Sequence, residues 1–161
     1  NFLSSQLFNM TLILSGVVFA NFYLHVRKVF AEDNQRTLAL IGSFFGVLGG
    51  LSLAGVGLTP ADLYLDLHMI CATWLFRFFF VASLCYSMVI FLHSQFENKY
   101  AMGYLLFTLS ILFYILISEL GPSPKEVPWA LTLQVVSQKM ILLILMSAIY
   151  IQTIGLKKLQ G

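Results

Sequence analysis

Long apolar segments separated by short polar connections dominate this chain. Five of them reach the roughly 18 to 25 residues that an α-helix needs to cross a bilayer. They cover residues 7–26, 37–58, 67–92, 100–118 and 129–156. None alternates apolar and polar residues as barrel strands do, so helices must satisfy the backbone groups in hydrocarbon. The pattern predicts an all-α integral membrane bundle of five transmembrane helices, forming one domain over residues 1–161.

The composition supports a membrane protein and excludes several function classes. Hydrophobic residues make up 59% of the chain and charged residues only 10%, against roughly 25% charged residues in a typical soluble domain. The net charge of +2 is spread along the chain, which argues against a nucleic-acid partner. Cys71 and Cys85 fall in one predicted helix about 21 Å apart. We therefore expect no disulfide and no cysteine metal site, and no motif indicates a cofactor.

Basic residues gather in every second connection, which predicts the orientation in the membrane. The six residues of this set are Arg27, Lys28, Arg36, Lys99, Lys157 and Lys158. The two opposite connections contain the single basic residue Lys125, together with Asp62, Asp66, Glu119 and Glu126. Because positive charge in short loops stays cytoplasmic, we expect a multi-pass protein with residue 1 outside and residue 161 in the cytoplasm. An outside N-terminus without a signal peptide suggests another helix upstream, giving six in the full protein.

Glycines line one face of the second predicted helix. Gly42, Gly46, Gly49 and Gly50 recur at spacings of three and four residues, which lets a neighbouring backbone approach closely. Helix packing within the chain is the ordinary interpretation. Contact with other membrane subunits through this face is the alternative.

The connection between the second and third helices contains the chain's one acid–base cluster. Asp62, Asp66 and His68 lie within seven residues. If this segment is helical, the two carboxylates share a face and could hold a cation or present a general base. Alternatively, they belong to a solvated loop that caps the next helix. A metal site would need further ligands, so we expect none.

Two cations lie deep inside predicted spans. Arg77 is about 13 Å along the third helix from His68, and Lys139 lies at a similar depth in the fifth. An unpaired charge there costs at least about 2.5–3.5 kcal/mol, so such residues are functional candidates. We expect both to point into the bundle and to require an anion, water or Glu119 as a partner.

Further polar residues converge on the same half of the predicted bundle. Gln134, Ser137 and Gln138 form a stripe on the outer half of the fifth helix. We interpret the whole set as a polar cavity open to the outer leaflet that binds a lipid headgroup or anion, or else as a buried network that joins helices. The proposed ligand-binding residues are Arg77, Lys139, Glu119, Asp62, Asp66, His68, Gln134 and Gln138.

Short motifs along most of the chain resemble a known family. They are Leu7-Phe8-Asn9 with Leu14-Ser15-Gly16, the glycine-rich second helix, and Gly57-x-x-Pro60-x-Asp62 leading to His68 and Ala72. They resemble a family of six-helix prokaryotic membrane proteins of unknown function and, more distantly, the eukaryotic DRAM, Frag and Sfk group associated with autophagy and membrane lipid organisation. The resemblance implies a six-helix fold and a lipid-related role. It supplies no catalytic residues, and Arg77 matches no position of the family pattern.

These observations favour a non-catalytic membrane protein that binds or organises lipid, or a small subunit of a membrane complex. One alternative is a membrane enzyme that acts on a lipid through Asp62, Asp66 and His68. Another is a small transporter with Arg77 and Lys139 in its pathway. Membrane lipids are the expected partners in each case.

Overall fold

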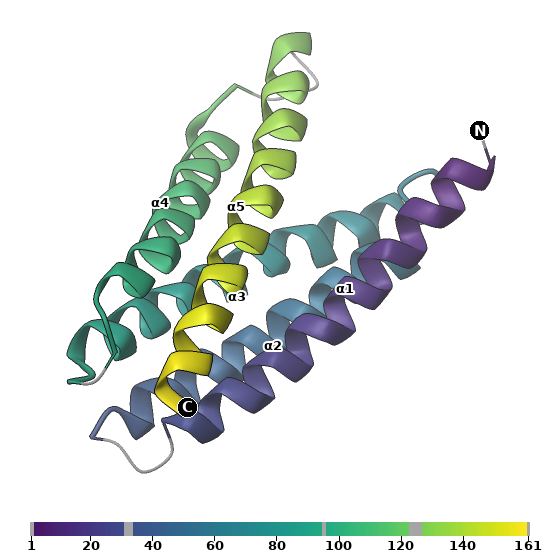
Figure 1. Cartoon of the computed structure of the whole chain (residues 1–161). Helices are drawn as coiled ribbons and strands as arrows, with labels where there is room; N and C mark the ends of the chain where they lie inside the picture. Colours follow the sequence, from purple (N-terminus) through teal and green to yellow (C-terminus); the bar gives the residue numbers. More distant parts are fainter. Residues whose placement is uncertain (1, 31–33, 95, 123–126, 161) are drawn as a thin grey trace. The chain divides into compact units, whose positions relative to one another are not determined.

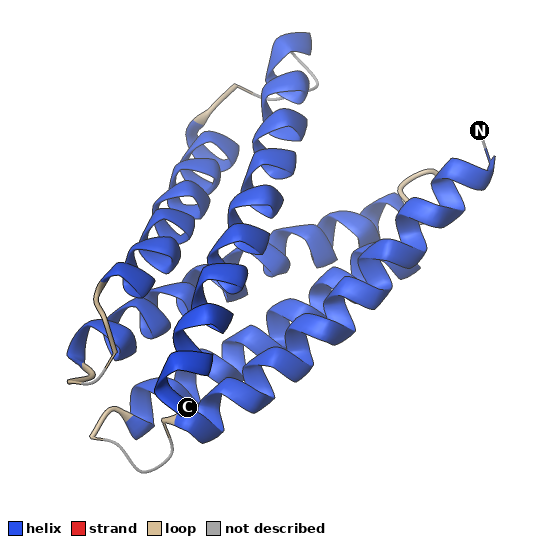
Figure 2. Ribbon diagram, in the orientation of Figure 1, coloured by secondary structure: helices blue, strands red, loops and turns tan. Residues whose placement is uncertain are grey.

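The computed structural model of the protein describes residues 2–30, 34–94, 96–122 and 127–160. These residues form the helices α1 (Phe2–Val29), α2 (Arg36–Leu58), α3 (Leu65–Leu92), α4 (Lys99–Leu120) and α5 (Pro128–Gln160) (Figure 1). Throughout the described ranges only helices and loops occur (Figure 2). The predicted all-α fold is confirmed, and every predicted segment lies within one of the helices. Lys125 and Glu126, which the orientation argument used, lie outside the described residues.

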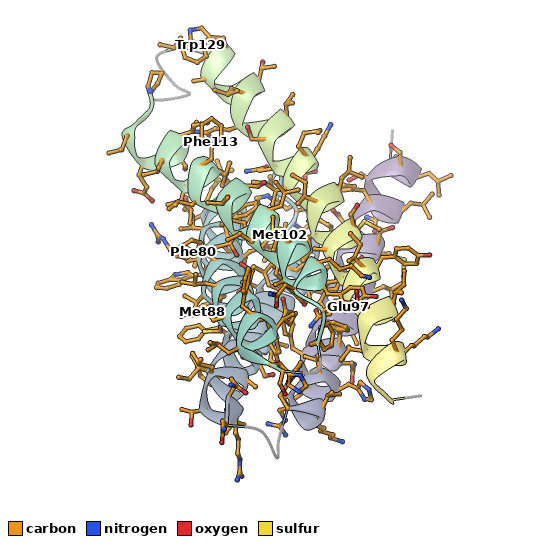
Figure 3. The ribbon with its side chains drawn as sticks, turned by 60° about the vertical axis from the view of Figure 1, so that its left-hand side comes forward. Phe80, Met88, Glu97, Met102, Phe113 and Trp129 are labelled. Carbon is orange, nitrogen blue, oxygen red and sulfur yellow. The ribbon has the colours of Figure 1, made fainter. Side chains whose placement is uncertain are left out.

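All five helices are long and apolar enough to cross a membrane. The shortest, α4, has 22 residues, or about 33 Å at 1.5 Å per residue, against a hydrocarbon core of roughly 30 Å. Large apolar side chains stand on the surface of these helices, among them Met102 and Phe113 of α4 and Trp129 of α5 (Figure 3), each more than half exposed. Such surfaces would be unfavourable in water and suit lipid. The chain thus has the architecture of a multi-pass membrane protein.

The end of α2 follows from its sequence. The helix stops at Leu58, and the Thr59 N–H and hydroxyl both donate to the Gly55 carbonyl, at 3.0 and 2.8 Å. Pro60 follows and has no N–H with which to continue the helix. Its carbonyl instead accepts the Tyr64 N–H at 2.8 Å, which closes a turn before α3 begins at Leu65.

The chain forms two compact units, residues 1–85 and 86–161, which are described separately. In the first unit, α1 and α2 run antiparallel and side by side (Figure 1). A Cβ added at Gly50 would lie only 2.6 Å from the Gly16 carbonyl oxygen, so glycine is what lets these backbones touch. The Ser43 hydroxyl donates to the Tyr23 carbonyl across the same pair at 2.8 Å.

The glycine face of α2 is covered inside this unit. Gly46 packs against the Tyr23 ring and Gly49 against the Phe79 ring of α3, while Gly42 and Gly50 are also buried. The helix-packing interpretation of the four glycines agrees with these contacts. Binding of another subunit stays a prediction, but these glycines do not form an open surface for it.

In the second unit, α4 and α5 pack along seams with alternating spacings of four and three residues. The buried seam of α4 comprises Tyr100, Tyr104, Phe107, Ile111 and Tyr114. The buried seam of α5 comprises Ile141, Leu145, Ala148, Gln152 and Gly155. This repeat is the one that joins helices in left-handed, coiled-coil-like pairs. Small residues bring the helices together, since Gly103 faces Ala148 and Gly155 lies against Phe96 and Tyr100.

Candidate functional site

The acid–base cluster of the sequence does not converge in the structure. Asp62 lies in the turn before α3, whose first residue is Leu65, so Asp62 and Asp66 do not share a helix face. Both carboxylates are exposed. Within the described ranges, no three histidine, cysteine, aspartate or glutamate side chains gather in a way that could hold a metal ion.

His68 has a structural partner instead. Its Nδ1 lies 2.7 Å from the Thr59 carbonyl oxygen. Because a carbonyl can only accept, Nδ1 must carry the proton. The half-buried imidazole thereby ties the first turn of α3 to the end of α2, a role that the spacing of acidic residues did not suggest.

Arg77 lies on α3 over an aromatic ring. Its guanidinium carbon is 5.6 Å from the centre of the Trp74 ring, and Trp74 stacks on Phe78 at 5.2 Å. Trp74 is three residues before Arg77, the spacing at which helix side chains meet. A cation–π contact contributes about 0.5–2 kcal/mol depending on desolvation, so it offsets part of the cost of a half-buried cation in an apolar span.

The remaining predicted site residues belong to the second unit. Glu119 and Lys139 are exposed, and Gln134 is half-buried. Gln138 donates a hydrogen bond to the Tyr114 hydroxyl at 2.6 Å, so it joins α5 to α4. Because Arg77, Asp62, Asp66 and His68 are in the first unit, the predicted cavity that combines all eight residues stays a prediction.

An apolar groove on the α4–α5 pair was not foreseen from the sequence. It has a volume of about 210 Å³, whereas an apolar cavity of about 150 Å³ already holds benzene. Its walls are Gly103 and Leu106 of α4 and Leu143, Ile144, Ser147, Ala148 and Ile151 of α5. The Ser147 hydroxyl donates to the Leu143 carbonyl at 2.9 Å, so it presents no unsatisfied donor to a hydrocarbon. The small residues Gly103, Ser147 and Ala148 were the available signal, but only the structure shows that they face one space.

A charged cluster lies at the end of the unit where α4 begins and α5 ends. The Glu97 carboxylate forms an ion pair with Lys99 and lies 4.0 Å from the Lys158 Nζ. The hydrogen bond from Lys99 is the main reason why the pKa of the Glu97 carboxyl is lowered. Lys99 also lies 5.2 Å from the centre of the Tyr100 ring. These contacts hold two ammonium groups around one carboxylate.

One buried polar side chain was also missed by the sequence analysis. Gln152 is fully buried in the α5 seam, and neither atom of its amide has a hydrogen-bond partner among the residues that the structure describes. An unsatisfied buried amide costs about 1–3 kcal/mol. Gln152 differs in this from Gln138, which occupies the same face of α5 and is paired.

These features define a multi-pass helical membrane protein with an apolar groove and a charged cluster in its second unit. Comparisons with protein families, characterised proteins and solved structures find no match. The resemblance to the six-helix family is therefore still an expectation, and the functional argument rests on the geometry.

Proposed function

We propose that the protein is a non-catalytic integral membrane protein that binds phospholipid, with an acyl chain lying in the α4–α5 groove. The observation that carries this proposal is the groove itself. Its walls are hydrocarbon apart from Ser147, whose hydroxyl is already satisfied by the Leu143 carbonyl. Leu106 and Leu143 are each more than half exposed at its edge, so an acyl chain can enter from the bilayer without crossing a polar surface.

The arrangement of acid–base groups favours binding over catalysis. A general acid–base pair must lie within hydrogen-bond reach of one reacting group. Asp62 and Asp66 are exposed and belong to different local structures, and the proton on His68 Nδ1 is engaged by a backbone carbonyl. Among the described residues, the enzyme alternative through Asp62, Asp66 and His68 therefore has no geometric observation in its favour.

Filling the groove tests the proposal. Gly103→Leu adds bulk from α4, and Ser147→Leu adds it from α5, so the two variants fill the same space from different helices. Leu116→Phe is the matched control, because Leu116 is an exposed α4 residue outside the groove lining. Native mass spectrometry of each purified, reconstituted protein counts the phospholipid that remains bound, and circular dichroism checks the helices.

We expect the native chain and Leu116→Phe to retain phospholipid and both filled variants to lose most of it while staying helical. The proposal would be wrong if the native chain retained none. It would also be wrong if folded Gly103→Leu and Ser147→Leu proteins retained as much phospholipid as the control.

A further inference from the structure

The charged cluster lies on the same side of the helix pair as the groove. Lys99 is four residues before the groove residue Gly103 on α4, and Lys158 is seven residues after Ile151 on α5. Spacings of four and seven residues bring side chains back to about the same side of a helix, so each lysine lies on the face of its helix that lines the groove. At 1.5 Å per residue, the ammonium-bearing residues lie about 6 and 10 Å beyond the groove along the helix axes. That is the direction in which the headgroup of a lipid with its chain in the groove would lie.

The net positive charge of the cluster suits an anionic headgroup better than a zwitterionic one, whose quaternary ammonium group it would repel. Lys99 and Lys158 both face Glu97, so the three charges sum to one net positive charge. Each ammonium has three donors, and a single carboxylate cannot accept all of them. A phosphate placed beside the cluster can take the remaining donors and match the net charge.

From these observations we propose that Lys99 and Lys158, which both face Glu97, form the headgroup site of the groove and select an anionic phospholipid. This inference rests on the proposed function and adds the class of ligand. Lys157 serves as an internal comparison. It is exposed on the same helical turn as Lys158 but is rotated by about 100° from it, so it adds the same charge to the surface in another direction.

A competition between two lipids tests the headgroup site. The full chain is placed in nanodiscs that contain equal amounts of phosphatidylglycerol and phosphatidylcholine with identical acyl chains, and the retained lipids are identified after purification. We expect the native chain to prefer phosphatidylglycerol. The double variant Lys99→Gln/Lys158→Gln should lower that preference by roughly thirtyfold, since each of the two lysines near an anionic lipid contributes on the order of 1 kcal/mol. Lys157→Gln should change it by less than about fivefold, the effect of one lysine close to the lipid, because Lys157 points away from the headgroup site.

Glu97→Gln should change the lipid preference in the direction opposite to the lysine double variant. It removes the carboxylate that competes with the lipid phosphate, so the preference for phosphatidylglycerol should rise. Unchanged selectivity in the double variant, or an equal loss in Lys157→Gln, would overturn the headgroup site while leaving lipid binding in the groove intact. Absence of any retained lipid from the native chain would instead overturn the proposed function itself.

Discussion

Replacing Gly50 with alanine should weaken the α1–α2 pair measurably. The added Cβ would lie 2.6 Å from the Gly16 carbonyl oxygen and 2.8 Å from the Ala20 backbone nitrogen. Both obstacles are backbone atoms, so no side chain can rotate out of the way. Restoring an ordinary contact of 3.4 Å requires the two backbones to separate by about 0.8 Å. A gap of 0.5–1 Å already forfeits a quarter to a half of the dispersion energy of the atoms concerned.

We expect Gly50→Ala to lower the free energy of unfolding by about 1–3 kcal/mol, the usual cost of overpacking. A gain of up to roughly 1 kcal/mol from the better helix propensity of alanine opposes this loss. Unfolding by sodium dodecyl sulfate in mixed micelles, followed by circular dichroism, measures the difference.

Gly103→Ala is the matched control for this measurement. A Cβ there would lie 3.4 Å from the Ala148 Cα, which is ordinary contact, so its stability should equal or slightly exceed that of the native chain. If Gly50→Ala proved as stable as Gly103→Ala, close backbone approach would not be what holds α1 to α2.

Other features of the structure lead to further expectations. Ser43→Ala removes the hydrogen bond to the Tyr23 carbonyl and should lower the free energy of unfolding by about 0.5–1.5 kcal/mol in the same titration; no change would mean that this bond contributes nothing net. Gln152→Leu should raise stability by about 1–3 kcal/mol, because it removes a buried amide that has no hydrogen-bond partner among the described residues; a decrease would indicate that a bound water or ligand satisfies the amide. The pKa of the Glu97 carboxyl is lowered chiefly by the Lys99 hydrogen bond, so the carboxylate stabilises the protein above the unfolded-state pKa, and this stabilisation is lost as the pH falls through the lowered pKa. Thermal melts of Glu97→Gln at a series of pH values should therefore lack this acid-dependent loss of stability. Identical pH profiles of the melting temperature for Glu97→Gln and the native chain would contradict this. Cysteines placed at 36 and 99 should react only with a reagent that reaches the cytoplasmic side, and a cysteine at 62 only from outside; the reverse pattern would invert the predicted orientation.

The helices could be predicted from the sequence because one physical requirement determines where they form. Segments in hydrocarbon must satisfy their own backbone groups, so apolar length alone located all five helices. The end of α2 was equally readable, since Pro60 lacks the N–H that would continue the helix. These features depend on neighbours in the sequence and need no knowledge of tertiary contacts.

The site could be predicted less well because it depends on which faces meet. The i, i+4 spacing of Asp62 and Asp66 has meaning only inside a helix, and the turn after Pro60 places Asp62 before the helix begins. His68 was a candidate for acid–base chemistry, yet its Nδ1 donates a hydrogen bond to the Thr59 carbonyl nine residues away. Lys99 and Lys158 were counted as orientation signals, and only the packing of α4 against α5 brings both to Glu97.

The two ends of the α4–α5 pair differ in a way that supports the proposed position of the lipid. Near the end of α4, the Gln138 amide of α5 donates a hydrogen bond to the Tyr114 hydroxyl of α4, so the chain's own side chains fill the space between the helices there. Toward Lys99, glycine and alanine take the place of large residues at Gly103 and Ala148. Their missing volume opens the groove on the surface of the pair, and the lysines lie beyond it. A lipid bound there would fill the groove with its acyl chain and bring its phosphate to Lys99 and Lys158, whose two positive charges Glu97 balances only in part.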